Sequence, residues 1–171
     1  MGSDAGSLEG VALVGRHALR EAGRQTLPFA KDDIRSEIWL KLWGNSTFNP
    51  ISALTHATLV DICEYPATRD LAATMMSEAQ VIAEKLGVRF AVSLEKRIAG
   101  AAAVGPHKTS MLQDVEAGRP IELAALLGSV IELARITDTP APTLTAIHAV
   151  ASLLGKTLQD QRGRLRIEAS A

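Results

Sequence analysis

Apolar residues recur at intervals of three and four along most of this chain, which is the spacing of one face of an α-helix. The clearest case is the stretch 66–87, in which Leu71, Met75 and Ile82 fall on one stripe. Aromatic residues make up only 4% of the chain, and no window alternates apolar and polar residues over a useful length, so strands are not expected. The pattern predicts an all-α domain, a bundle of about seven helices.

Prolines, glycines and capping residues set the expected helix ends. Pro50 should kink or end the second helix, whereas Pro66 and Pro120 should each occupy a first helical position. A Ser110-x-x-Gln113 capping box should open a helix that stops near residue 118. The expected helices cover residues 11–21, 34–49, 51–62, 66–86, 94–98, 110–117, 120–136 and 143–158, and the alanine-rich residues 100–106 form a helix end and loop.

Length and composition suit one globular domain. The chain has 171 residues and a formal net charge of -1, so it lacks the basic footprint of a nucleic-acid-binding protein. No apolar run approaches a membrane span, the four histidines show no metal-ligand spacing, and the single cysteine, Cys63, is expected in the core. We expect a tag or linker at 1–10, one domain at 11–158, a flexible tail at 159–171, and a cytoplasmic location.

Polar side chains form a helical stripe between residues 39 and 50. Lys41, Asn45 and Asn49 are spaced at i, i+4 and i+8, with Trp39 and Trp43 beside them. An amine and two carboxamides next to indoles suggest a polar site with apolar walls. A solvent-facing stripe on an amphipathic helix explains the same spacing.

A second segment, residues 108–122, holds further candidates. Taken locally, Ser110 is a helix cap, Asp114 can pair with Arg119, and Glu122 is a favourable acid in a first helical turn. Each of these residues therefore has a purely structural explanation.

Together, the two segments resemble the C-terminal domain of ketopantoate reductase (2-dehydropantoate 2-reductase). The resemblance lies in Trp39-x-Lys41-Leu42-x-x-Asn45-x-x-x-Asn49-Pro50, followed about 60 residues later by Ser110-Met111-x-Gln113-Asp114-x-x-x-Gly118-Arg119-x-x-Glu122. It implies an all-helical substrate domain like that of 6-phosphogluconate dehydrogenase-type enzymes. It also implies an NADPH-dependent oxidoreductase that acts on a small 2-oxo acid in pantothenate biosynthesis.

The resemblance also implies roles for single residues. Lys41 matches the catalytic lysine, and Glu122 matches an acidic residue at the cleft between substrate and cofactor. Asn45, Asn49 and Ser110 match substrate-binding positions. A further substrate asparagine of the family would fall on Leu59, which leaves the natural 2-oxo acid open.

The chemistry of a lysine fits that role. Reduction of a ketone creates an alkoxide, which a lysine ammonium can stabilise and protonate.

The chain departs from the family in one large respect. It contains no Gly-x-Gly-x-x-Gly between a strand and a helix, so we expect no NADPH binding by this chain alone and a Rossmann domain in cis or in trans. Our leading hypothesis is a substrate-binding and dimerisation domain that forms a homodimer. The alternative is a non-catalytic helical association module derived from the family. The leading hypothesis predicts that Lys41, Glu122 and the three substrate-binding residues converge on one concave surface.

Overall fold

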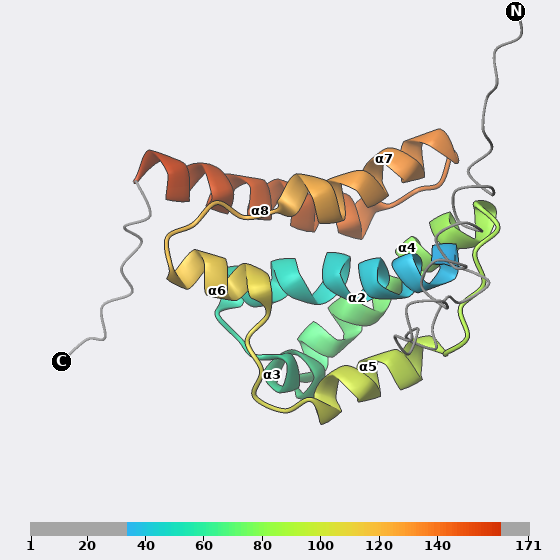
Figure 1. The fold of residues 1–171 in the computed structure, drawn as a ribbon, viewed down its shortest axis with the longest axis horizontal. Coiled ribbons are helices and arrows are strands. Elements are labelled where there is room, and N and C mark those ends of the chain that lie inside the picture. Colours follow the sequence, from blue (N-terminus) through green and yellow to red (C-terminus); the bar gives the residue numbers. More distant parts are fainter. Residues whose placement is uncertain (1–33, 162–171) are drawn as a thin grey trace, which may run out of the picture. The chain divides into compact units, whose positions relative to one another are not determined.

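The structure is a computed structural model that describes residues 34–161. Between these residues every element is a helix and none is a strand, which confirms the predicted all-α class. The elements are α2 (Ile34–Thr55), α3 (Leu59–Glu64), α4 (Pro66–Lys85), α5 (Leu94–Ala103), α6 (Ser110–Glu116), the π-helical segment η1 (Ala124–Gly128), α7 (Ser129–Ile136) and α8 (Pro142–Asp160) (Figure 1). The helix expected at 11–21, the tag or linker at 1–10 and residues 162–171 lie outside the described residues. No helix in the described range is both long and apolar enough to cross a membrane.

The helix α2 does not end at Pro50 but continues to Thr55. A proline inside a helix removes one hydrogen bond and costs about 3 kcal/mol. Pro50 and its neighbours Asn49 and Ile51 are buried, and the packing of this segment offsets that cost. The helix then stops because His56 has a left-handed backbone, with φ of 58°. The single helical run expected over 51–62 is therefore divided between α2 and α3.

The ends of α4 and α5 follow from their capping residues. Pro66 occupies the first turn of α4, and Gly87 follows that helix with φ of 81°, as predicted. Ser93 caps α5 by accepting a hydrogen bond from the Lys96 amide. However, α5 continues beyond Ile98 to Ala103, since alanine is the strongest helix former and Gly100 alone does not break the run.

The segment from 109 to 136 differs from the prediction at two places. The cap of α6 is Thr109, whose side chain accepts from the Leu112 amide at 3.2 Å, so Ser110 is the first helical residue and not the cap. Asp114 pairs with Arg119 at 2.8 Å, as the sequence suggested. Pro120 does not begin a helix, because the next helical residue is Leu123. The last helix agrees closely with its predicted range but extends to Asp160.

The helix α4 holds the core together. It packs against α3, α5, α7 and α8, and α3 also packs against α5. Met75, Met76 and Ile82 of α4 are fully buried. The indole of Trp43, on α2, donates to the Met76 carbonyl at 2.7 Å and lies against the Phe90 ring, with 4.3 Å between ring centroids. In the view of Figure 1, α2 runs between α8 above it and α3 and α5 below it.

Two charged side chains of α4 tie it to the connection between α7 and α8. The carboxylate of Glu78 accepts from the backbone amides of Thr143 and Leu144, both at 2.9 Å, at the start of α8. The ammonium of Lys85 donates to the carbonyls of Thr137 and Asp138, both at 3.0 Å, after α7. An acid at a helix start and a base at a helix end both complement the helix dipole.

Candidate active site

The polar stripe of α2 runs from the surface into the protein. Lys41 is exposed, Asn45 is half-buried, and Asn49 is 5% exposed. A stripe that merely faced solvent would not bury its last member. The two tryptophans do not form the walls of a site as expected, because Trp39 and Trp43 belong to the hydrophobic core.

Asn45, Asn49 and Ser110 line one cavity of about 380 Å³, which we call the asparagine cavity. Residues of α2, α3, α5, the α5–α6 loop and α6 surround it. The remaining lining residues are Gly44, Phe48, Leu59, Arg97, Ala101, Val104, His107 and Thr109. Thus the fold brings together three of the five predicted site residues, although about 60 residues of sequence separate the two asparagines from the serine.

Three polar side chains of this cavity, Asn45, Asn49 and Ser110, are not committed to other partners. In the part of the chain that the structure describes, no side chain or backbone group hydrogen-bonds to the carboxamides of Asn45 and Asn49 or to the hydroxyl of Ser110. Because Thr109 caps α6, the Ser110 hydroxyl is not needed by the helix backbone. The carboxamide atoms of Asn49 are not among the buried side-chain atoms without a partner, so they face the cavity and are accessible to a ligand that enters it.

Leu59 forms part of the apolar wall of the asparagine cavity. Its amide donates to the carbonyl of His107 at 3.0 Å, which holds the start of α3 against the loop between α5 and α6. The position at which the family resemblance expects an asparagine therefore lies at this cavity, and here it offers an apolar contact.

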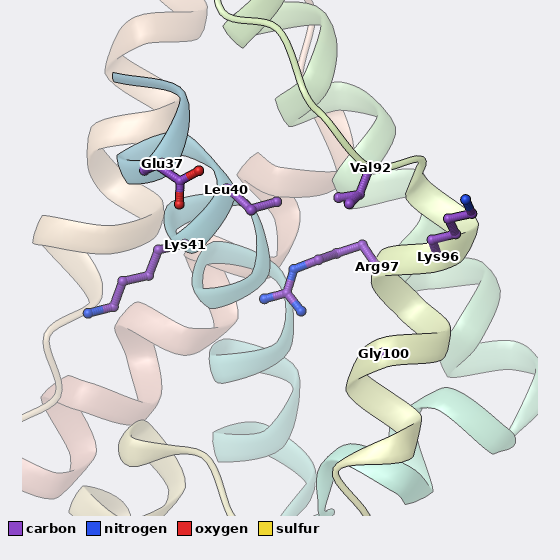
Figure 2. A pocket seen from close by; sticks show the side chains of 7 residues that line it. All are labelled: Glu37, Leu40, Lys41, Val92, Lys96, Arg97 and Gly100. Carbon is purple, nitrogen blue, oxygen red and sulfur yellow. The ribbon is translucent and has the colours of Figure 1, made fainter. Parts of the chain in front are cut away.

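A second cavity, also of about 380 Å³, lies between α2 and α5, and we call it the lysine cavity. Its lining residues are Glu37, Leu40, Lys41, Val92, Lys96, Arg97 and Gly100 (Figure 2). Arg97 lines both cavities. In Figure 2 the Arg97 side chain extends from α5 toward α2, whereas the Lys41 side chain extends from α2 away from Arg97. Lys41 is thus next to the asparagine cavity but not in it.

Glu122 lines neither cavity. It is exposed and lies just before Leu123, so it is not a first-turn acid of a helix that begins at Pro120. Its backbone carbonyl instead accepts a hydrogen bond from the Leu126 amide at 3.3 Å. The expected convergence of all five residues on one surface is therefore incomplete in this chain.

Arg97 is a candidate residue that lies outside both family motifs. The Nε atom of Arg97 is buried and has no hydrogen-bond partner, and its guanidinium lies so close to Gly44 that a Cβ atom there would collide with it. A glycine in the interior of a helix costs about 0.5–1 kcal/mol relative to alanine, so Gly44 was the available signal for a close approach to α2.

Two ionisable groups, Cys63 and Asp61, have perturbed pKa values. Burial raises the pKa of the Cys63 thiol above its ordinary value of 9.0, and the charges of Arg69 and Arg97 partly oppose that shift. Hydrogen bonds from the Thr58 side chain and amide lower the pKa of Asp61. Neither residue lines the two cavities. Residues 34–161 contain no group of three or more histidine, cysteine or acidic side chains that could hold a metal ion.

Comparison with known proteins gives the same family as the two motifs. The family model described as ketopantoate reductase PanE/ApbA C terminal matches residues 33–154. The 2-dehydropantoate 2-reductase of Mesorhizobium japonicum is 59% identical over 124 residues, which are 72% of this chain and 38% of that protein. The corresponding enzyme of Archaeoglobus fulgidus is 28% identical over 127 residues, which are 74% of this chain and 42% of that protein.

A solved structure agrees with these sequence relatives. The crystal structure of 2-dehydropantoate 2-reductase from Methylococcus capsulatus is similar with a TM-score of 0.72 and 29% identity, over 95% of this chain and 54% of that one. The chain thus spans less than two thirds of the length of each of these three relatives. From the matched residues and the shared fold, the chain belongs to the ketopantoate reductase family and corresponds to its C-terminal domain.

Proposed function

We propose that this chain is the substrate-binding part of an NADPH-dependent 2-oxo acid reductase, and that its substrate is 2-dehydropantoate. The observation that carries the proposal is the set of uncommitted polar groups around the asparagine cavity, namely Asn45, Asn49 and Ser110. The names of the relatives from M. japonicum and A. fulgidus supply the substrate.

The residue types of the asparagine cavity suit a hydroxylated 2-oxo acid. Each carboxamide of Asn45 and Asn49 offers two donors and one acceptor, and the hydroxyl of Ser110 offers one donor and two lone pairs. These neutral groups can orient carbonyl and hydroxyl oxygens without adding charge. Phe48, Leu59 and Val104 provide the apolar surface that the carbon skeleton of such an acid requires.

Lys41 is assigned the role of charge stabiliser and proton donor. When a ketone is reduced, its oxygen becomes an alkoxide, and an ammonium group beside that oxygen lowers the barrier. Lys41 is exposed in this chain, where water weakens such an interaction. A second domain that covered the lysine cavity would exclude water and strengthen it. We assign the exposed Glu122 to the same covered cleft, on the cofactor side.

The described residues do not fit NADPH by themselves. The positive-φ glycines of this range, Gly87, Gly105 and Gly118, each follow the end of a helix. A dinucleotide cradle needs glycines between a strand and the start of a helix. We therefore assign the nicotinamide cofactor, which would supply the hydride, to a Rossmann domain in cis or in trans.

The alternative role, a non-catalytic association module, would not require uncommitted side chains around a cavity. Association itself is compatible with both roles, and we propose a homodimer. Its support is an apolar stripe on the exposed face of α8, formed by Ala146, Ala149, Val150 and Leu153. Sedimentation velocity should show a concentration-dependent mass that Leu153→Asp reduces to the monomer, and a monomer at all concentrations would remove the homodimer.

Calorimetric titration of the chain with 2-dehydropantoate tests the proposed function. Asn45→Ala and Ser110→Ala should each weaken binding by about three- to tenfold, which corresponds to one neutral hydrogen bond. Ser77→Ala is the matched control, because Ser77 is exposed on α4 and bonds only to the Ala73 carbonyl. Absence of binding, or equal binding by all variants, would contradict the assignment.

A further inference from the structure

Arg97 occupies the boundary between the two cavities. It belongs to α5, it lines both the asparagine cavity and the lysine cavity, and its side chain extends toward α2 (Figure 2). A Cβ atom at Gly44 of α2 would collide with its guanidinium. A single side chain thus lines both cavities.

The guanidinium of Arg97 lacks an acceptor in the described part of the chain. Its Nε is buried without a partner, and it forms no ion pair with any residue between 34 and 161. A charged group that leaves water without a partner loses hydration free energy. A bound anion would recover it, and a carboxylate fits best because the planar guanidinium can donate two parallel hydrogen bonds to its two oxygens.

The charges around Arg97 favour an anion in the asparagine cavity. Arg97 is the only formally charged side chain among the lining residues of that cavity, and His107 is its only other titratable one. The lysine cavity adds two cations, Lys41 and Lys96, and one carboxylate, Glu37. A small acid that entered the asparagine cavity would therefore meet a cation and no competing carboxylate.

Gly44 leaves room for the guanidinium of Arg97. A Cβ atom at residue 44 would lie about 3.0 Å from the Cζ of Arg97 and collide with its Nη2. The glycine lies in the interior of α2, where alanine would favour the helix. The missing side chain leaves the room that Arg97 occupies, and glycine is less favourable than alanine at this helical position.

We propose that Arg97 binds the carboxylate of the 2-oxo acid and determines that the site takes an acid in preference to a neutral ketone. The proposal rests on the proposed function, because it needs the asparagine cavity to be the substrate site. In this arrangement Arg97 holds the carboxylate at the Gly44 side of the cavity. Asn45, Asn49 and Ser110 then contact the remaining oxygens.

The proposal is tested by comparing an acid with its neutral analogue on the full chain. The probes are 3-methyl-2-oxobutanoate and 3-methyl-2-oxobutanamide, which have nearly the same size and differ in charge. The wild-type chain should bind the acid at least about tenfold more tightly, as expected for a charged hydrogen-bonded pair. Arg97→Met should remove that preference, whereas Asn45→Ala should weaken both probes alike.

Further variants separate charge from position. Arg97→Lys keeps the charge but loses the two-pronged geometry, so it should recover only part of the preference. Gly44→Ala keeps the guanidinium but displaces it, and should reduce the preference without removing any polar group. Arg69→Met is the matched control, because Arg69 is an arginine of α4 that pairs with Glu95 and lines neither cavity. It should leave both affinities unchanged.

The outcomes distinguish this inference from the proposed function. If both probes bind through Asn45 but Arg97→Met keeps the preference for the acid, the role of Arg97 is wrong and the proposed function stands. If acid binding depends on Arg97 but not on Asn45, Arg97 binds carboxylates outside the asparagine cavity, and both the proposed function and this proposal fail. If the wild-type chain binds neither probe, both are overturned. Should Arg97→Met not fold, the wild-type preference and Gly44→Ala still decide.

Discussion

The guanidinium of Arg97 lies against the backbone of Gly44, at a point of α2 where any side chain would collide with it. One helix thus carries a residue unfavourable for its own stability so that a cation from another helix can lie close to it. This relationship places a positive charge at the edge of a cavity whose other polar groups are neutral.

Gly44→Ala should change the free energy of unfolding less than Gly100→Ala does. Alanine favours a helix over glycine by about 0.5–1 kcal/mol. A Cβ at Gly100 of α5 meets nothing within 4 Å, so that variant should gain the full amount. At Gly44 the gain is offset by displacement of Arg97. Urea unfolding of both variants measures the difference, and an equal or larger gain at Gly44 would show that the close contact has no energetic consequence.

Thr47→Val should stabilise the protein. Thr47 is fully buried and its hydroxyl has no hydrogen-bond partner, so replacing the hydroxyl by a methyl group should add about 1 kcal/mol. Thr109→Val is the matched control with the opposite sign. Thr109 caps α6 through the Leu112 amide, and loss of that cap should cost about 0.5–2 kcal/mol. Thermal unfolding that shifted in the same direction for both would contradict the structure.

Glu78→Ala should destabilise the fold by about 1–3 kcal/mol. The substitution leaves the amides of Thr143 and Leu144 without an acceptor and removes a negative charge from the start of α8. Glu84→Ala is the control on the same helix, because Glu84 is exposed and pairs only with Gln80. Its effect should stay within about 0.5 kcal/mol. Equal effects in chemical denaturation would mean that Glu78 does not cap α8.

Stability should fall in alkaline solution because of Cys63. Burial raises the pKa of this thiol in the folded state above 9.0, so the unfolded chain releases the proton first. The contribution of Cys63 is fully present below pH 9.0 and is lost as the pH rises through the folded-state pKa. The difference in unfolding free energy between the wild type and Cys63→Ala should therefore shrink above pH 9.0 and stay constant below it. A constant difference throughout would contradict the burial of the thiol.

The helix pattern and the family motifs predicted much of this structure. The apolar stripe of α4 and its limits at Pro66 and Gly87 are local signals, and the helix in the structure agrees with them. The predicted end of this helix near Asn49 was wrong, because packing on both sides of Pro50 outweighs the local preference of a proline. The helix predicted to start at Pro120 starts at Leu123 instead, because a proline permits a first helical turn but does not require one.

The candidate site likewise contains residues that local motifs could predict and one that only the fold reveals. Asn45, Asn49 and Ser110 could be named from motifs, although only the fold shows that they share a cavity. The cap moved from Ser110 to Thr109 because two adjacent hydroxyl residues offer the same hydrogen bond in sequence. Arg97 could not be found from periodicity, because its importance arises from a contact with Gly44, 53 residues earlier in the chain.

The structure of the chain with 2-dehydropantoate bound tests the account most directly. We expect the acid in the asparagine cavity, with Asn45, Asn49 and Ser110 hydrogen-bonded to its oxygens and its carboxylate paired with Arg97. A ligand bound at another surface, or the same cavity filled by these side chains bonded to one another while the ligand stays in solution, would contradict it.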